Sequence, residues 1–309
     1  MTLTELKYIV AVARERHFGR AAEACFVSQP TLSVAVKKLE EELDVKLFER
    51  GANEVSVTPL GEQIVRQAQL VIEQAAALKE MAKLGKDPLS GPLRMGVIYT
   101  IGPYLLPDLV RQAIARVPQM PLMLQENFTA KLLDMLRLGE LDCAILAEPF
   151  PDTGLAMAPL YDEPFVAAVP TKHALAKRKT ISAEELKAET MLLLGTGHCF
   201  RDHVLEVCPE YARFASTSSG GEGISKSFEG SSLETIKYMV ASGMGVTVVP
   251  QLSVPAESQP HIKYIKFSAP APTRRVVLAW RRSFPRYEAI AALRNAIYAC
   301  PLPGVKRLS

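Results

Sequence analysis

Residues 18–43 read FGRAAEACFVSQPTLSVAVKKLEEEL, and this segment predicts two helices joined by a short turn. The first helix covers residues 19–24 and ends before Val27. Ser28 stands where an N-cap residue is expected, and Pro30 lies in the first turn of the next helix, where its missing N–H costs nothing. That helix carries one apolar stripe at helical spacing, formed by Leu32, Val36, Leu39 and Leu43. The pattern is typical of a helix-turn-helix, whose second helix presents its N-terminal end outward.

The sequence on either side completes an N-terminal domain. Helical spacing of apolar residues predicts a preceding helix that contains Leu3, Leu6, Val10 and Ala13. After the second helix, residues 46–50 and 55–57 read as two short strands around a turn, which together form a small hairpin wing. We therefore expect a winged helix-turn-helix domain over residues 1–60.

A long helix is expected next, because the only Gly or Pro from Leu60 to about Leu84 is Gly61. Its apolar residues follow the heptad spacing of a two-stranded coiled coil: Ile64, Ala68, Val71, Ala75, Leu78 and Ala82. This predicts a dimerisation helix over residues 61–88, about 37 Å long at 1.5 Å per residue. The alternative is an ordinary amphipathic helix that packs on its own domain.

The remaining residues, 93–309, alternate strand-like and helix-like runs, which predicts an α/β domain with partly parallel sheets. Strands are expected at residues 93–98, 121–125, 141–147, 165–169, 191–194, 245–249 and 275–280. Helices are expected at residues 104–117, 130–138, 182–188, 233–242 and 286–299. The last strand and helix are expected to return to the first half. This gives two lobes, one of residues 93–169 and 272–309 and one of residues 170–271, with a cleft suited to a ligand.

The composition of the 309 residues, 48% hydrophobic and 22% charged, is that of a folded chain about two domains long. No apolar stretch approaches the roughly 18 residues that span a bilayer, and no signal peptide is recognised, so we expect a cytoplasmic protein without membrane contact. The five cysteines form no C-x-x-C pair and the histidines are scattered. We therefore expect no structural metal and no cofactor.

Bulk charge gives no argument for nucleic-acid binding. The net charge is +3, and residues 1–66 hold nine basic against ten acidic side chains. A DNA-binding surface must therefore rest on local placement. At the start of the outward helix, short polar side chains can reach base edges, namely Gln29, Thr31 and Ser33, and Pro30 lies on the same face as Ser33. Basic side chains nearby can reach phosphates: Lys37, Lys38 and, from the wing, Arg50. The alternative is that Ser28 and Gln29 only cap the helix and make no contact with DNA.

A second candidate site follows the strand expected at residues 191–194. The segment TGHCFRDH, residues 196–203, places Cys199 after a glycine-flanked strand end, where a helix would begin. The positive end of a helix dipole, with His198, Arg201 and His203 nearby, would favour the thiolate. The alternative is a small buried hydrophobic residue, the usual state of a free cysteine. The other cysteines outside this region are expected to be inert: Cys25, Cys143 and Cys300.

At this point the chain resembles a known family, the LysR-type transcriptional regulators. The resemblance is carried in the N-terminal part by FGRAAE (18–23), VSQPTLS (27–33), KLEEEL (38–43), LFER (47–50) and TPLG (58–61). In the C-terminal part, the motifs are similar to the OxyR, or peroxide-sensing, branch of that family: GVIYTIGPYLLP (96–107), GELDCAIL (139–146), GHCFRD (197–202) and Cys208. The resemblance implies a periplasmic-binding-protein-like regulatory fold, in agreement with the two lobes, and a protein that is not an enzyme.

The resemblance also implies a set of roles for individual residues. Cys199 would be the peroxidatic cysteine, oxidised by hydrogen peroxide to a sulfenic acid, and Cys208 the resolving cysteine of a reversible disulfide. Three side chains would bind and position the peroxide: Thr100, Thr129 and His198. Three charged side chains would tune the thiolate: Arg201, Asp202 and Arg275. The implied partners are double-stranded promoter DNA of oxidative-stress defence genes, further copies of the chain up to a homotetramer, and RNA polymerase.

The spacing of the two cysteines has a mechanical consequence. If residues 199–208 are helical, nine steps separate the two Cα atoms by about 13.5 Å along the axis, whereas a disulfide needs about 4.4–6.8 Å. The helix must therefore melt before the bond can close, and Pro209 is well placed to end it. The Ser- and Gly-rich residues 215–223 would supply slack for that rearrangement.

Three other functions remain open on the sequence. A LysR-type regulator could bind a small-molecule effector between its two lobes, with both cysteines incidental. A thiol peroxidase would account for Cys199 but leaves the N-terminal third unexplained. A secreted solute-binding protein is disfavoured because no signal peptide is recognised.

Overall fold

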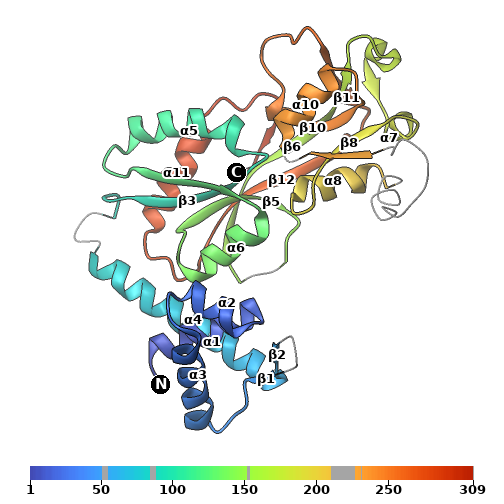
Figure 1. Cartoon of the computed structure of the whole chain (residues 1–309). Coiled ribbons are helices and arrows are strands. Elements are labelled where there is room, and N and C mark those ends of the chain that lie inside the picture. The colour runs from blue at the N-terminus through green and yellow to red at the C-terminus, as the bar shows by residue number, and fades with distance from the viewer. Residues whose placement is uncertain (51–54, 84–87, 152–153, 210–226, 231, 309) are drawn as a thin grey trace. The chain divides into compact units, whose positions relative to one another are not determined.

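The structure is a computed structural model, and it describes the chain except for residues 51–54, 84–87, 152–153, 210–226, 231 and 309 (Figure 1). The wing turn at 51–54 and the Ser- and Gly-rich segment at 215–223 therefore lie outside the described residues. The chain divides into two compact units. The first holds Met1–Lys86 with two short pieces, Arg137–Glu140 and Ser283–Pro285, and the second holds the rest. The domain and lobe boundaries expected above stay predictions.

The first unit begins with the three predicted helices, α1 (Leu3–Glu15), α2 (Phe18–Ala24) and α3 (Gln29–Leu43). Ser28 is the N-cap of α3, and its side chain accepts a hydrogen bond from the Thr31 N–H. Leu32, Val36 and Leu39 are buried in a core shared with α1 and α2, which confirms the predicted stripe. The wing follows as two antiparallel strands, β1 (Phe48–Arg50) and β2 (Val55–Val57).

The predicted long helix is present as α4 (Pro59–Lys83). Ala68 and Ile72 are buried in the core of the first unit, and α4 contacts α1. Two members of the heptad seam are not covered by this chain, because Val71 is 39% and Leu78 71% exposed. The helix thus packs on its own unit through one face, as expected for an ordinary amphipathic helix. Part of its heptad face is left uncovered. Dimerisation through α4 stays a prediction.

The second unit is built on a mixed sheet in the order β4-β3-β5-β12-β6-β11-β7, with β10 and β13 also paired to β6. The strands are β3 (Leu93–Ile98), β4 (Leu122–Asn127), β5 (Cys143–Glu148), β6 (Ala156–Pro170), β7 (Thr180–Ile181), β10 (Thr247–Pro250), β11 (Ile262–Phe267), β12 (Thr273–Trp280) and β13 (Lys306–Arg307). β3 is parallel to β4 and β5, whereas β12 is antiparallel to β5 and β6.

The longest strand, β6, belongs to two parts of this sheet. Its first half pairs with β12, and its second half, from Phe165 on, pairs with β10 and β11. The sequence predicted only residues 165–169 of it, because only that half is a continuous buried apolar run. On the first part of the sheet lie α5 (Gly102–Arg116), α6 (Thr129–Leu138) and α11 (Tyr287–Tyr298), of which α5 and α11 pack side by side (Figure 1).

A smaller parallel sheet of β8 (Met191–Leu194) and β9 (Ser227–Gly230) completes the second unit. Near it lie α7 (Ala183–Leu186), α8 (Cys199–Val207) and α10 (Leu233–Ala241). Two short 3-10 turns, η1 (Ala174–Lys177) and η2 (Gln251–Ser253), contact β6. One apolar cluster joins these elements to the second half of β6. Among the residues that the structure describes, no helix is long and apolar enough to cross a membrane.

Candidate functional site

Cys199 is the first residue of α8, as the sequence predicted. The chain leaves β8 at Leu194 and turns through Gly197, whose φ of +100° lies in the left-handed region that favours glycine. A Cβ on Gly197 would also approach the Phe128 ring to 3.3 Å. His198 then occupies the N-cap position without a capping hydrogen bond from its side chain, and Cys199 is partly exposed at the positive end of the helix.

A small cavity brings together four residues that the resemblance had singled out. Its walls include Thr100, Thr129, His198 and Cys199, which come from three different segments of the chain. Its volume is about 10 Å³, close to the least space that holds one water-sized molecule. The His198 ring closes one side, with its centroid 4.8 Å from that of Phe128 in an edge-to-face contact. We call this space the Cys199 cavity.

The two threonine hydroxyls have different surroundings. Among the described residues, the buried Thr129 Oγ1 has no hydrogen-bond partner. Thr100 Oγ1 accepts a hydrogen bond of 2.8 Å from Arg274 Nη1. Because a guanidinium can only donate, this bond uses an acceptor site of Thr100 and leaves its O–H proton for another partner. Both hydroxyls can therefore bond a small polar molecule in the Cys199 cavity.

Arg274 is the charged residue behind this arrangement. Its side chain is 1% exposed and forms an ion pair of 2.8 Å with Glu163, which is 0% exposed. It also donates to the Thr100 carbonyl, and its guanidinium lies 5.2 Å from the centre of the Phe200 ring, next to Cys199 in the chain. Arg274 thus joins β12, β6 and the segment after β3 beneath the Cys199 cavity.

The structure does not bring Arg275 to the Cys199 cavity, which corrects the expectation from the sequence. Successive side chains on a strand point to opposite faces, so neighbours on β12 cannot both face Thr100. The Arg275 side chain is 50% exposed and pairs with Asp162 at 2.8 Å. This pairing raises the pKa of Arg275. The sequence shows two adjacent arginines but not which of them points toward the Cys199 cavity. It therefore gave no sign that Arg274 and Glu163 belong to the site.

The remaining charged residues of α8 do not line the Cys199 cavity. Arg201 is half-buried and Asp202 is exposed. His203 was expected to add positive charge near Cys199, but it is buried, and its Nε2 lies 2.8 Å from the Glu148 carbonyl oxygen. Burial above all lowers the pKa of His203, so that the neutral ring is favoured and the expected charge is absent.

Cys208 is the C-cap residue of α8 and is fully buried in the apolar cluster. The helix between the two cysteines is thus present, and the separation of about 13.5 Å along its axis follows from 1.5 Å per residue. The other cysteines lie in environments that disfavour the thiolate. Burial raises the pKa of Cys25, Cys143 and Cys300, that of Cys300 to about 11.

The candidate nucleic-acid surface lies at the start of α3. Gln29, Pro30 and Thr31 are exposed and Ser33 is half-buried, so three of the four predicted residues are open to a partner. Lys37 and Lys38 are exposed as well, although both lie within 4 Å of a carboxylate, at 3.6 Å from Glu41 and 3.9 Å from Glu5. The side chain of Arg50 lies outside the described residues.

One acid of the run at residues 40–42 has a structural task. Glu40 is buried, and its Oε1 accepts hydrogen bonds of 2.8 Å from the Leu47 N–H and 3.2 Å from the Phe48 N–H. The carboxylate therefore fixes the start of the wing against the end of α3. The sequence did not show this role, because it depends on a contact between separate elements.

A larger cavity of about 350 Å³ opens beside the Cys199 cavity and shares Thr100 and His198 with it. Tyr104 and Glu234 line it from α5 and α10, and the Tyr104 hydroxyl donates a hydrogen bond of 2.6 Å to Glu234. The pKa of Tyr104 is raised, mainly by burial and then by the hydrogen bond to Glu234, so this hydroxyl stays protonated. The volume lies in the range of small-molecule sites.

Comparison with known protein families accounts for both units. The family described as "Bacterial regulatory helix-turn-helix protein, lysR family" matches residues 3–62, and the family described as "LysR substrate binding domain" matches residues 86–299. The chain is similar to the hydrogen peroxide-inducible genes activator of Pectobacterium carotovorum subsp. carotovorum, with 40% identity over 94% of this chain and 95% of that protein.

Two solved structures are similar over nearly the whole chain. Full-length OxyR C199D from Pseudomonas aeruginosa is 51% identical, with a TM-score of 0.68 and coverage of 97% of this chain and 99% of that one. A cysteine-to-serine mutant of Corynebacterium glutamicum OxyR with bound hydrogen peroxide is 32% identical, with a TM-score of 0.61 and coverage of 96% of this chain and 91% of that one.

Proposed function

The chain belongs to the LysR family of bacterial helix-turn-helix regulators, and we propose that it is a DNA-binding regulator that senses hydrogen peroxide through Cys199. The Cys199 cavity carries this proposal. It holds space for a very small polar molecule, two hydroxyls that can bond it, and a cysteine at a helix N-terminus. The names of its relatives, which include peroxide-inducible gene activators and OxyR, support the same signal.

The first chemical step is a nucleophilic attack by the Cys199 thiolate on one peroxide oxygen. The S–O bond forms as the O–O bond breaks, the sulfur loses two electrons, and the departing hydroxide is protonated to water. Thr100 is oriented by Arg274 to donate toward the departing oxygen, and Thr129 offers a second hydroxyl without a competing partner. His198 closes the cavity, with its ring packed against Tyr99 and Phe128. The product is the sulfenic acid of Cys199.

The second step is condensation of this sulfenic acid with the Cys208 thiol, which forms a disulfide and releases water. Cys208 is fully buried at the other end of α8, so the helix must unfold before the two sulfurs meet. Oxidation is thereby converted into a two-state structural change of the second unit. Arg201 and Asp202, which lie in α8, would then change their surroundings together with the helix.

We propose that the first unit binds double-stranded promoter DNA through the start of α3. Gln29, Pro30, Thr31 and Ser33 would face base edges, and Lys37, Lys38 and Arg50 would contact phosphates. The uncovered heptad residues of α4 would join two chains, and two such dimers would make a tetramer on DNA. The regulator would act in the cytoplasm and respond to oxidation by a changed contact with RNA polymerase.

The decisive experiment compares Cys199→Ser and Cys143→Ser with the parent chain. Intact and peptide mass spectrometry after about one equivalent of hydrogen peroxide would show a loss of two hydrogens and a peptide in which Cys199 and Cys208 are cross-linked. Cys199→Ser would abolish this product and the peroxide response of DNA binding, whereas the buried Cys143→Ser would leave both intact. An unmodified Cys199 in the parent chain would overturn the proposal.

A second candidate function is supported by the cavity of about 350 Å³. A regulator that binds a small effector there would respond to that effector and not to peroxide. Tyr104→Phe separates the two functions, because it removes the hydroxyl that bonds Glu234 in this cavity. A loss of regulation in Tyr104→Phe together with an unchanged response in Cys199→Ser would favour the effector.

A further inference from the structure

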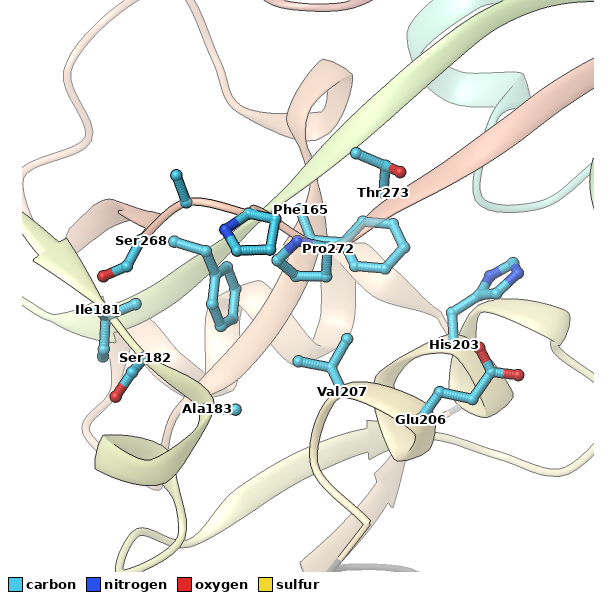
Figure 2. Close-up of a pocket in the computed structure, with 13 residues that line it drawn as sticks. Phe165, Ile181, Ser182, Ala183, His203, Glu206, Val207, Ser268, Pro272 and Thr273 are labelled. Atoms are coloured by element: carbon cyan, nitrogen blue, oxygen red, sulfur yellow. The ribbon is translucent and has the colours of Figure 1, made fainter.

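A cavity of about 480 Å³ lies beside α8 and shares no lining residue with the Cys199 cavity (Figure 2). We call it the α8 pocket. Its apolar walls are formed chiefly by Phe165, Ile181, Val207, Phe267, Pro270 and Pro272. Its volume falls within the range of about 300–1,000 Å³ that is usual for small-molecule sites. Neither the Cys199 chemistry nor the DNA surface makes use of it.

The buried polar group of the α8 pocket is His203. Its Nε2 lies 2.8 Å from the Glu148 carbonyl oxygen, and because a carbonyl only accepts, Nε2 carries the proton of the neutral ring. The other ring nitrogen, Nδ1, is then an acceptor. Among the described residues, this buried Nδ1 has no hydrogen-bond partner. A buried acceptor without a donor carries a desolvation cost that a suitable ligand would remove.

The second polar group is the Glu206 carboxylate. Figure 2 shows Glu206 and His203 close together at one side of the pocket, with Phe165, Pro272 and Val207 along the rest. Among the lining residues that the structure describes there is no lysine or arginine. The side of the α8 pocket at Glu206 and His203 therefore offers a negative charge and a neutral acceptor. The rest offers aromatic and aliphatic surface together with the side chains of Ser182, Ser268 and Thr273.

We propose that the α8 pocket binds a small organic amine, with an apolar or aromatic body against Phe165 and Val207 and an ammonium group toward Glu206 and His203. An ammonium group supplies a donor for the buried His203 Nδ1 and a positive charge for the exposed Glu206 carboxylate. A carboxylate or phosphate ligand is disfavoured, because its charge would face Glu206 and no described lining residue supplies a cation to offset it. An uncharged ligand of the same shape would gain only the apolar contact.

Such a ligand would also restrain the redox switch, a consequence that rests on the proposed function. His203, Glu206 and Val207 all belong to α8, so the pocket exists only while this helix is folded. A ligand that binds one of two states shifts the balance toward that state by a factor of 1 + [L]/Kd. The amine would therefore oppose the unfolding of α8 that the Cys199–Cys208 disulfide requires.

The binding test uses three probes of one shape and different charge: 2-phenylethylammonium, 2-phenylethanol and phenylacetate. Their affinities for the reduced, full-length chain are measured by calorimetric titration or ligand-observed NMR. We expect the amine to bind most tightly and phenylacetate most weakly. Absence of binding by the amine, or equal binding by phenylacetate, would overturn the proposal.

Two variants locate the binding. Glu206→Gln keeps the shape of the side chain and removes its charge, so it should weaken the amine about two- to fivefold, as for a partly exposed ion pair, and leave 2-phenylethanol unchanged. Ala183→Trp should fill the pocket and weaken both probes. Glu288→Gln, an exposed acid on α11, serves as the control for a general charge effect. Amine binding that is unchanged in the first two variants would place it elsewhere and refute the assignment.

A kinetic measurement then tests the coupling to α8. With the amine at ten times its Kd, disulfide formation should slow about tenfold, while the preceding formation of the sulfenic acid keeps its rate. An unchanged rate of disulfide formation would contradict the coupling. If peroxide left Cys199 unmodified without the amine, the proposed function would fail, but the binding measured with the three probes would stand.

Discussion

Arg274 Nη1 lies 2.8 Å from Thr100 Oγ1, and this contact fixes the direction in which the threonine hydroxyl can donate. The guanidinium has five donors and no acceptor, so the Thr100 O–H cannot point at it. The same guanidinium is held by Glu163, and all three groups are buried. A surface cysteine has no such donor prearranged beside it, and this difference leads to the first prediction.

Thr100→Val should slow the oxidation of Cys199 by hydrogen peroxide about 10²-fold, the usual effect of losing one prearranged donor at a developing negative charge. Stopped-flow kinetics of sulfenic acid formation measures this rate. Alkylation by iodoacetamide needs no donor for a departing oxygen and should change little. Thr100→Ser keeps the hydroxyl and should restore most of the rate. Equal slowing of both reactions in Thr100→Val would show that the threonine only shapes the site.

Glu163→Gln should destabilise the protein by about 3 kcal/mol or more, because it leaves the buried Arg274 charge without its partner. The control is Asp162→Asn, which removes the partner of the half-exposed Arg275 and should cost at most about 1 kcal/mol. The free energy of unfolding in urea measures both. Similar losses in the two variants would show that burial of the Glu163–Arg274 pair does not increase its contribution to the free energy of unfolding.

The stability of the second unit should depend on pH through His203. Burial lowers the pKa of His203 in the folded protein, so the unfolded chain takes up the proton first as the pH falls. Stability is therefore complete above the unfolded pKa of about 6.5 and decreases as the pH falls from there through the lower folded pKa. Urea unfolding at about pH 7.5 and 5.5 should show this loss, and His203→Gln should reduce it. A loss of the same size in His203→Gln would show that another group carries the pH dependence.

Gly197→Ala should slow peroxide oxidation of Cys199 and lower stability by about 1 kcal/mol or more, since alanine is strained at a φ of +100°. Its Cβ would also press on Phe128, which lines the Cys199 cavity. Gly154→Ala is the control for backbone strain alone, because Gly154 also has a positive φ but no atom of the described residues lies within 4 Å of a built Cβ. Slowed oxidation in both variants would trace the effect to backbone strain alone.

Gln29→Ala should weaken binding to the chain's own promoter DNA by about 1–3 kcal/mol and relax its preference at one base position. Lys37→Ala should weaken binding to all sequences and reduce the salt dependence by about one counterion. Fluorescence anisotropy at several salt concentrations separates the two. A sequence-independent loss in Gln29→Ala would mean that this residue contacts the backbone or merely stabilises the start of α3.

Local patterns in the sequence determined the first unit almost completely. The cap at Ser28, the position of Pro30 and the stripe of Leu32, Val36 and Leu39 act within one helix, and each appears where it was predicted. The start of α8 at Cys199 was also predictable, since a glycine turn after a buried strand is a local signal. Helical spacing likewise gave α4, because a heptad pattern needs no knowledge of distant residues.

Only the tertiary structure decided which way a side chain points and which residues from distant parts of the sequence it contacts. Alternation along β12 turns Arg274 inward to Glu163 and Thr100 and turns Arg275 outward, and the sequence of two arginines has no feature that separates them. The Glu148 carbonyl that accepts a hydrogen bond from His203 comes from a strand 55 residues away, and burial among such distant elements keeps the ring neutral although this hydrogen bond by itself raises the pKa. Charge state and hydrogen-bond direction are set by such long-range contacts, so only the folded chain reveals them.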